Sequence, residues 1–165
     1  MILYAAYGSN LNIAQMKRRC PNASAYTAIS LENWRLVFKG VADIEKDNNS
    51  NLLLGLYKIT KHCEKKLDIY EEYPNVYKKH YFTKKVNGKK VYIMLYIMNS
   101  KFSYSIPTLK YFEVIKEGYE NWSFKSDFLF TAGYHSIKNN TLEGYKSKNW
   151  NDKSFLNENY LRSNG

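Results

Sequence analysis

The sequence is poor in the residues that build disulfide frameworks and metal sites. Its 165 residues include two cysteines and three histidines. Cys20 and Cys63 form no closely spaced pair and no cluster with histidine, so neither a disulfide framework nor a zinc site is indicated. We therefore expect both cysteines to be free thiols. A chain of this length can bury a core without cross-links.

Long hydrophobic runs are also missing. No apolar segment approaches the length that crosses a membrane, and the first residues lack the basic start and cleavage site of a secretory signal. We therefore expect a soluble protein of the cytoplasm with no membrane partner. A chain of 165 residues is most simply one domain.

The common short motifs of nucleotide-binding and metal-dependent enzymes are absent. There is no P-loop, no dinucleotide fingerprint and no His-Glu-x-x-His. His62, His80 and His135 are not paired at ligand spacing, so we expect them to be structural or exposed rather than catalytic. We expect no metal and no cofactor.

Positive charge is the most unusual feature of the composition. Lys and Arg number 25 against 15 Asp and Glu, which gives a formal net charge of +10. Such an excess raises the question of nucleic-acid binding. The basic residues occur as scattered couplets between Tyr, Asn and Ser, and the sixteen tyrosines form no recognisable RNA-binding motif. We therefore expect a solvated basic surface and no nucleic-acid partner.

The first residues predict a strand, a tight turn and a helix. Residues 2–7 are mostly apolar and fit a buried strand, which ends at Gly8-Ser9-Asn10. Asn12 precedes "IAQMKRR" with Gln15 three residues later, an arrangement typical of a helix start, and Pro21 ends the helix. The turn either only connects the strand to the helix, or it presents backbone N–H groups to an anion.

The remaining pattern predicts an α+β domain whose five or six strands are largely antiparallel. Asn87-Gly88 marks the clearest hairpin. We expect strands at 24–31, 34–40, 52–59, 76–86 and 89–99, and an exposed loop at 43–51. We expect three further helices: one that follows Thr60 and ends at Pro74, one over 109–122, and one from Ser126 to Gly133. We assign residues 1–134 to the domain and 135–165 to a polar, basic tail that is surface-packed or flexible.

Acidic residues cluster once beside aromatic ones, in "LDIYEEYPNVY" at residues 67–77. Asp68 and Glu71 stand three apart on one helix face, and Glu72 follows directly. Like charges and partial burial both raise the pKa of a carboxyl group towards the range useful for proton transfer near neutral pH. On composition alone, however, an acidic couplet at a helix end is usually a solvated surface.

Several segments together resemble the γ-glutamylcyclotransferase family. They are "YAAYGSNLN" (4–12), "MKRRCPNA" (16–23), "WRLVFKGVADI" (34–44), "LDIYEEYPNVYKK" (67–79), "YIMN" (96–99) and "PTLKYFEVIKEGY" (107–119). The resemblance covers roughly residues 1–134, in the family's order. It implies a small mixed, mostly antiparallel β-barrel surrounded by a few helices.

The resemblance also implies site residues. The substrate loop is Tyr4, Ala5, Ala6, Tyr7, Gly8 and Ser9, with Asn10 supporting its shape, and Tyr77 and Tyr111 are further substrate contacts. The family's acid-base glutamate falls at Glu71, where it is usually followed by glycine; here Glu72 replaces that glycine.

The implied reaction cleaves a γ-glutamyl amide. The α-amino group attacks its own γ-carbonyl, and 5-oxoproline and a free amine are released without metal or cofactor. Family substrates include γ-glutamyl amino acids and γ-glutamyl amines, and the sequence leaves this choice open, with glutathione disfavoured. A non-catalytic module that binds a small γ-glutamyl or carboxylate metabolite is the alternative. The oligomeric state is open, a homodimer included.

Overall fold

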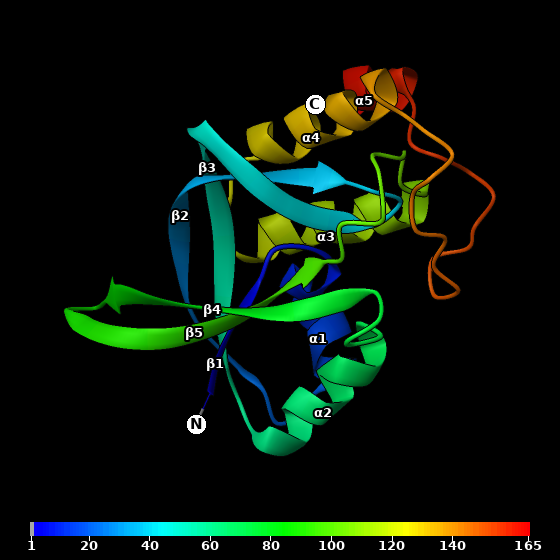
Figure 1. Cartoon of the computed structure of the whole chain (residues 1–165). Helices are drawn as coiled ribbons and strands as arrows, with labels where there is room; N and C mark the ends of the chain where they lie inside the picture. Colours follow the sequence, from blue (N-terminus) through cyan, green and yellow to red (C-terminus); the bar gives the residue numbers. More distant parts are fainter. Residues whose placement is uncertain (1) are drawn as a thin grey trace.

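A five-stranded mixed sheet forms the centre of the structure, a computed structural model that describes residues 2–165 (Figure 1). In chain order the elements are β1 (Ile2–Ala6), the 3-10 helix η1 (Ser9–Leu11), α1 (Ile13–Arg19), β2 (Ser24–Phe38), β3 (Ala42–Ile59), α2 (Lys61–Tyr70), β4 (Tyr77–Val86), β5 (Lys89–Met98), α3 (Leu109–Asn121), α4 (Asp127–Lys138) and α5 (Glu158–Asn164).

The strand order β2-β3-β1-β5-β4 places β1 in the middle. β1 pairs antiparallel with β3 and parallel with β5, and the other two pairs are antiparallel. The predicted α+β class with a mixed, mostly antiparallel sheet is confirmed. Within residues 2–165 β2 and β4 are the edge strands, so the sheet is open rather than closed into a barrel. The turn after β1 therefore leaves the sheet from its centre.

The prediction of an exposed loop at residues 43–51 is wrong. These residues belong to β3 and pair with β2, with Trp34 opposite Lys46 and Glu32 opposite Asn51. The expected runs 24–31 and 34–40 are likewise not two strands: residues 24–38 form one strand, β2, with a register shift between Glu32 and Trp34, and Lys39 and Gly40 lie beyond its end. Residues 45–51 are at least partly exposed, whereas Asp43 and Ile44 are buried. Pairing with a partner strand decides the backbone conformation.

Local signals predicted the starts of α1 and α2 and the hairpin between β4 and β5, but not the end of α4 or the helix α5. The Asn12 side chain accepts a hydrogen bond from the Gln15 N–H, and Thr60 does the same for Cys63. Asn87 and Gly88, both at positive φ, connect β4 and β5 as predicted. α4 does not end at Gly133 but continues to Lys138.

Gly133 serves close packing rather than helix termination. A Cβ atom there would lie 3.1 Å from Leu156 and Phe112 side-chain atoms and 3.2 Å from Leu161. Small residues let neighbouring chain segments approach, and this contact brings the C-terminal residues onto α4.

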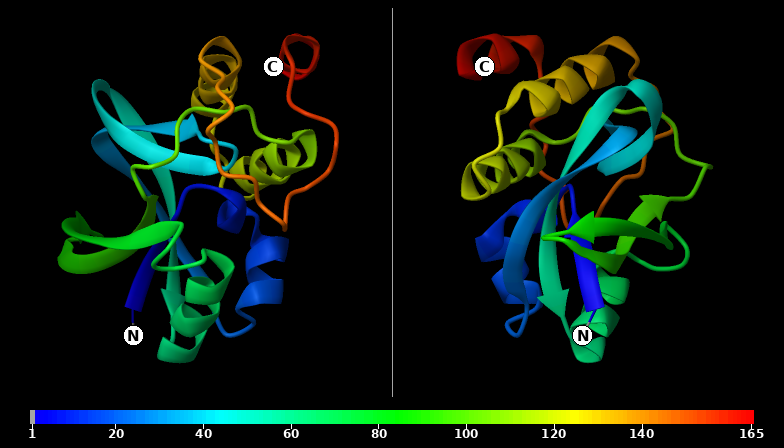
Figure 2. Two further views of the ribbon diagram at one scale, coloured as in Figure 1. Left: turned by 45° about the vertical axis from the view of Figure 1, so that its right-hand side comes forward. Right: turned by 90° about the vertical axis from the view of Figure 1, so that its left-hand side faces the viewer.

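The C-terminal residues return to the body of the protein. α4 and α5 lie together at the end of the molecule opposite α2 (Figure 1). The segment between them leaves α4, runs towards the turn that follows β1 and returns to α5 (Figure 2). Leu156 and Leu161 are buried. The division of the chain at residue 134 stays a prediction.

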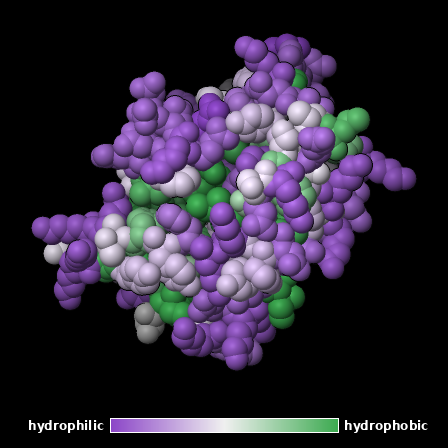
Figure 3. All heavy atoms as spheres, viewed as in Figure 1, coloured by the Kyte–Doolittle hydropathy of each residue, from purple (hydrophilic) through white to green (hydrophobic). Residues whose placement is uncertain are grey.

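One face of the molecule is mostly polar. Hydrophilic residues dominate the face shown in Figure 3, and hydrophobic residues gather in smaller patches between them. No helix among residues 2–165 is long and apolar enough to span a membrane.

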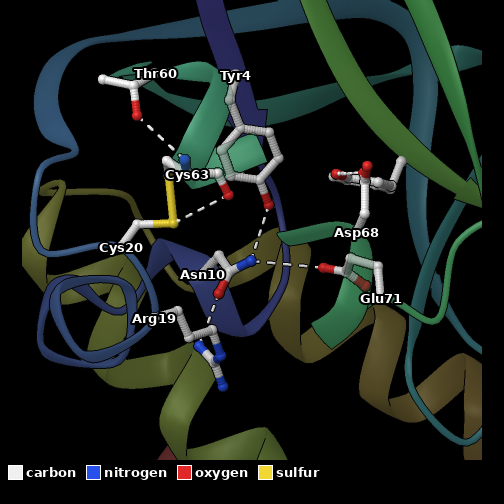
Figure 4. Close-up of a disulfide and its surroundings, with 9 residues drawn as sticks. Tyr4, Asn10, Arg19, Cys20, Thr60, Cys63, Asp68 and Glu71 are labelled. Carbon is white, nitrogen blue, oxygen red and sulfur yellow. Dashed lines mark hydrogen bonds between the residues drawn. A yellow bond between two sulfur atoms is a disulfide. The ribbon is translucent and has the colours of Figure 1, made fainter. Parts of the chain in front are cut away.

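The expectation of two free thiols is wrong, because Cys20 and Cys63 form a disulfide (Figure 4). Cys20 caps the end of α1, Cys63 lies in the first turn of α2, and their Cα atoms are 5.3 Å apart. The 43-residue separation gave no sign of this pairing, which depends on the packing of α1 against α2. The bond ties α1 to α2, the two helices beside the turn that follows β1.

Loss of this disulfide is expected to destabilise the fold. Replacing Cys20 and Cys63 together by alanine should lower the free energy of unfolding by about 2–4 kcal/mol, because the unfolded chain regains the entropy of an open loop. Urea denaturation with and without reductant measures this. Reductant should bring the native protein close to the double variant and leave the variant unchanged. Equal stability of the two proteins without reductant would contradict the cross-link.

Candidate active site

The turn after β1 is a tight 3-10 turn packed against β3 and α3. The Leu11 N–H donates to the Gly8 carbonyl (3.0 Å) and the Asn12 N–H to the Ser9 carbonyl (3.1 Å). A Cβ atom on Gly8 would lie 3.1 Å from the Ala42 Cβ and 3.3 Å from the Tyr111 hydroxyl. Since η1 starts at Ser9, the first N–H groups of this short helix have no acceptor within it. The turn therefore has backbone N–H groups that are unpaired within η1, and there is little space for a side chain at Gly8.

A narrow cavity of about 40 Å³ opens beside this turn. Eight of the residues predicted from the sequence line it: Tyr4, Tyr7, Gly8, Ser9, Asn10, Glu71, Tyr77 and Tyr111. Ala5 and Ala6 are not among the lining residues, because they are buried in the core at the centre of the sheet. Residues 61 positions apart in the sequence, Asn10 and Glu71, thus meet at one cavity.

Glu71 reaches the cavity from the end of α2. Its N–H donates to the Leu67 carbonyl (2.8 Å), and the chain then turns through Glu72 at a φ of 50°. That left-handed conformation favours glycine, which has no Cβ. The resemblance places a glycine at this position, and the turn gives the physical reason for it. Glu72 adopts the same turn at some conformational cost.

The carboxyl group of Glu71 has a perturbed pKa. Burial raises the pKa of Glu71 to about 8, and the positive charge of Arg19 opposes part of this rise. The Asn10 side-chain N–H donates a long hydrogen bond of 3.5 Å to Glu71 Oε1 (Figure 4). A carboxyl group that titrates near neutral pH is suited to both accepting and donating a proton.

Asn10 links this carboxyl group to its surroundings. The side chain is 2% exposed, and its N–H₂ group also donates to the Tyr4 hydroxyl (3.0 Å). Its Oδ1 accepts from Arg19 Nη1 (2.7 Å), and its backbone carbonyl accepts from the Tyr57 hydroxyl (2.8 Å). With Oδ1 bonded to a cation, the amide presents its N–H₂ side to Glu71 (Figure 4).

The tyrosines fix the cavity walls through backbone contacts. The Tyr7 hydroxyl donates to the Tyr96 carbonyl (2.6 Å) and the Tyr77 hydroxyl donates to the Ala42 carbonyl (2.5 Å). The Tyr111 hydroxyl accepts from the Ala42 N–H (2.9 Å). Burial raises the pKa of all three hydroxyls well above the usual value, so they stay neutral. They line the cavity as neutral hydroxyl groups near neutral pH.

The sequence interpretation missed Arg19, Tyr70 and Trp150. The Arg19 guanidinium lies 3.7 Å from the centre of the Tyr70 ring, and the Tyr70 hydroxyl is 2.9 Å from Ser9 Oγ. The Trp150 indole N–H donates to the same hydroxyl (2.8 Å). Arg19 and Tyr70 fall inside the quoted motifs, but nothing singled them out there. Trp150 lies in the tail, where the sequence gave no signal.

Comparisons with known proteins address the family and the fold. The family model "Gamma-glutamyl cyclotransferase, AIG2-like" matches residues 4–123. No curated protein matches the chain.

Three solved structures are similar in fold. A protein described as "Gamma-glutamyl cyclotransferase" has 20% identity and a TM-score of 0.71, with 98% of both chains covered. The uncharacterised human protein LOC79017 has 20% identity and a TM-score of 0.69, again with 98% of both chains covered. YkqA from Bacillus subtilis has 18% identity and a TM-score of 0.68, covering 85% of this chain and 55% of its own.

Proposed function

This chain belongs to the gamma-glutamyl cyclotransferase, AIG2-like family, and from that membership we propose that it is an enzyme that cleaves a γ-glutamyl amide to 5-oxoproline and a free amine or amino acid. Glu71 is the proposed general acid and base. Tyr4, Tyr7, Gly8, Ser9, Asn10, Tyr77 and Tyr111 form the proposed γ-glutamyl pocket.

One observation carries the proposal. A carboxyl group with a pKa of about 8 lies at the wall of a narrow cavity, within hydrogen-bond reach of Asn10 in the turn that follows β1. A surface carboxylate at a helix end keeps its ordinary pKa, so the perturbed group favours proton transfer over mere solvation.

The reaction needs one proton acceptor that later becomes a donor. The ionised Glu71 carboxylate takes a proton as the α-amino nitrogen bonds to the γ-carbonyl carbon. The carbon–nitrogen bond to the leaving group then breaks, and Glu71 returns the proton to that nitrogen. The products are 5-oxoproline and the amine.

Ring closure is intramolecular, so positioning contributes much of the rate. Holding the γ-glutamyl chain in the ring-closing rotamer gives the attacking nitrogen a high effective concentration. The N–H groups at Gly8 and Ser9 are the proposed donors to the oxygen that becomes negative. A preorganised donor at such an oxygen contributes on the order of 3 kcal/mol to the activation free energy.

We propose a small-molecule γ-glutamyl substrate and no nucleic-acid partner. The cytoplasmic location also stays a prediction; the Cys20–Cys63 bond is of a kind that oxidising compartments favour. The choice between one subunit and a homodimer stays open to measurement.

Purified protein incubated with a panel of γ-glutamyl amides should release 5-oxoproline, which mass spectrometry detects directly. We expect turnover with at least one γ-glutamyl amino acid or amine. We expect no turnover with the matching α-glutamyl amides, because their amide bond is at the α-carbonyl and they have no γ-amide for the α-nitrogen to attack. Tight binding of γ-glutamyl compounds without any release would contradict the proposal and favour the binding module.

A further inference from the structure

A long segment between α4 and α5 forms one side of the cavity that contains Glu71. We call residues 139–156 the strap. Near its start the Tyr145 N–H donates to the Lys39 carbonyl (2.8 Å). Near its end the Ser154 carbonyl accepts from the Leu109 N–H (2.8 Å). The strap is anchored on both sides, and its residues Tyr145, Ser147, Asn149 and Trp150 line the cavity. Figure 2 shows the path of this segment between α4 and α5.

Trp150 is held in the cavity wall by two contacts. Its indole N–H donates to the Tyr70 hydroxyl (2.8 Å), which is also 2.9 Å from Ser9 Oγ. Its ring meets Tyr111 edge-on, with 5.1 Å between ring centres. Both partners line the Glu71 cavity, so the indole has a fixed orientation there.

A second, larger cavity lies on the other side of this wall. Its volume is about 670 Å³, against about 40 Å³ for the inner cavity, and the two share Tyr145, Ser147 and Trp150. Pockets that bind small molecules usually measure about 300–1,000 Å³. The inner cavity is therefore too small for a whole γ-glutamyl amide, and the outer cavity adjoins it at Tyr145, Ser147 and Trp150.

The outer cavity is apolar with a basic edge. Ile106, Phe155 and the shared aromatic residues supply apolar surface. Lys146 and Lys153 also line it and are exposed. Asp152 lines the cavity as well. Its Oδ2 accepts from the Lys110 N–H at the start of α3 (3.3 Å), and its Oδ1 is buried without a hydrogen-bond partner, so one carboxylate stands against the two lysines. The apolar residues and the excess of lysine over aspartate in this lining favour an apolar ligand that carries a negative charge.

We propose that Trp150 is a specificity-determining residue, and that the outer cavity binds the leaving amino acid of the substrate through a large apolar side chain and a carboxylate. The side chain packs on Trp150 and the carboxylate faces Lys146 and Lys153. This inference rests on the proposed function, since it names the leaving group of that reaction.

Steady-state release of 5-oxoproline from a matched pair of substrates tests the side-chain preference. For the native enzyme we expect kcat/KM to be about tenfold or more higher for γ-glutamylphenylalanine than for γ-glutamylglycine. Trp150→Ala should reduce that ratio to near one. Trp150→Phe keeps an apolar ring without the bond to Tyr70 and should retain most of the ratio. Phe128→Ala, an exposed aromatic residue of α4, is the control and should leave the ratio unchanged.

A second pair tests the carboxylate. γ-Glutamyl-2-phenylethylamide has the ring of γ-glutamylphenylalanine but lacks its carboxylate. We expect Lys146→Glu with Lys153→Glu to lower kcat/KM for the acid about threefold to tenfold more than for the neutral amide.

The outcomes separate the two proposals. Release of 5-oxoproline from no γ-glutamyl amide overturns the reaction itself. Release that occurs with a phenylalanine-to-glycine ratio near one in the native enzyme, or with a ratio that survives Trp150→Ala, overturns the assignment of Trp150 and leaves the reaction standing. Preference for a cationic leaving amine would overturn the role of the two lysines.

Discussion

Glu71→Gln is expected to lower kcat for 5-oxoproline release about 1,000-fold or more. General acid-base catalysis contributes about 10²–10⁴-fold, and Glu71 is the proposed proton acceptor and donor in successive steps. Glutamine preserves the size of the side chain and can still accept the hydrogen bond from Asn10 through its amide oxygen. The KM for the substrate should therefore change much less than kcat.

Glu72→Gly is the matched control for this variant. It removes a carboxylate from the neighbouring position and places glycine where the φ is 50°. We expect retained activity and a gain in stability of about 1 kcal/mol from relief of the left-handed conformation. If Glu72→Gly abolished activity and Glu71→Gln did not, the wrong carboxylate would have been assigned.

The stability of Glu71→Gln reports on the same group without any substrate. The pKa of Glu71 is about 8 in the folded protein and 4.5 in its ordinary state, so the folded protein retains a proton that the unfolded chain loses between those pH values. The native protein therefore loses stability as pH rises through this window, and glutamine does not. Glu71→Gln should have a higher Tm than the native protein at pH 9, with the difference shrinking towards pH 4.

Short-range chemistry explains why much of the fold was predictable. Asn12 and Thr60 cap helices through hydrogen bonds to residues three positions away, and Asn87-Gly88 needs only its own backbone freedom to turn the chain. The errors lie where distant segments decide. Residues 43–51 are strand because β2 pairs with them, and Gly133 lies within α4, where its lack of a side chain leaves room for Leu156.

The candidate site shows the same division. The turn at Gly8 and the carboxyl group of Glu71 could be named from motifs, and the structure brings both to one cavity. Arg19 could not be selected, because its role depends on the position of Asn10 and Tyr70 after folding. Neither the disulfide nor the strap left a local pattern, since each joins segments that only the completed fold brings together.

Arg19→Met is expected to shift the pH dependence of the reaction. The native kcat/KM should rise with pH as Glu71 ionises, with a midpoint near its pKa of about 8. Arg19 is the cation that lowers the pKa of Glu71, so its removal should raise that pKa and move the rising limb to higher pH. Because the ionised fraction falls tenfold per pH unit below the pKa, kcat/KM at pH 7 should fall in step with the rise of the midpoint.

The shape of the profile distinguishes this effect from simple loss of structure. Arg19 also donates to Asn10 Oδ1 and stacks on Tyr70, so Arg19→Met should lose about 1–3 kcal/mol of stability through the unpaired amide oxygen. A merely structural role would lower the rate at every pH and leave the midpoint in place.

Arg18→Met removes the same charge from an exposed neighbour on α1 and should leave the midpoint unchanged. Arg19→Lys keeps the charge without the planar guanidinium, and its midpoint should lie between those of the native enzyme and Arg19→Met. A midpoint for Arg19→Met that coincides with the native one would show that the guanidinium does not set the ionisation of Glu71.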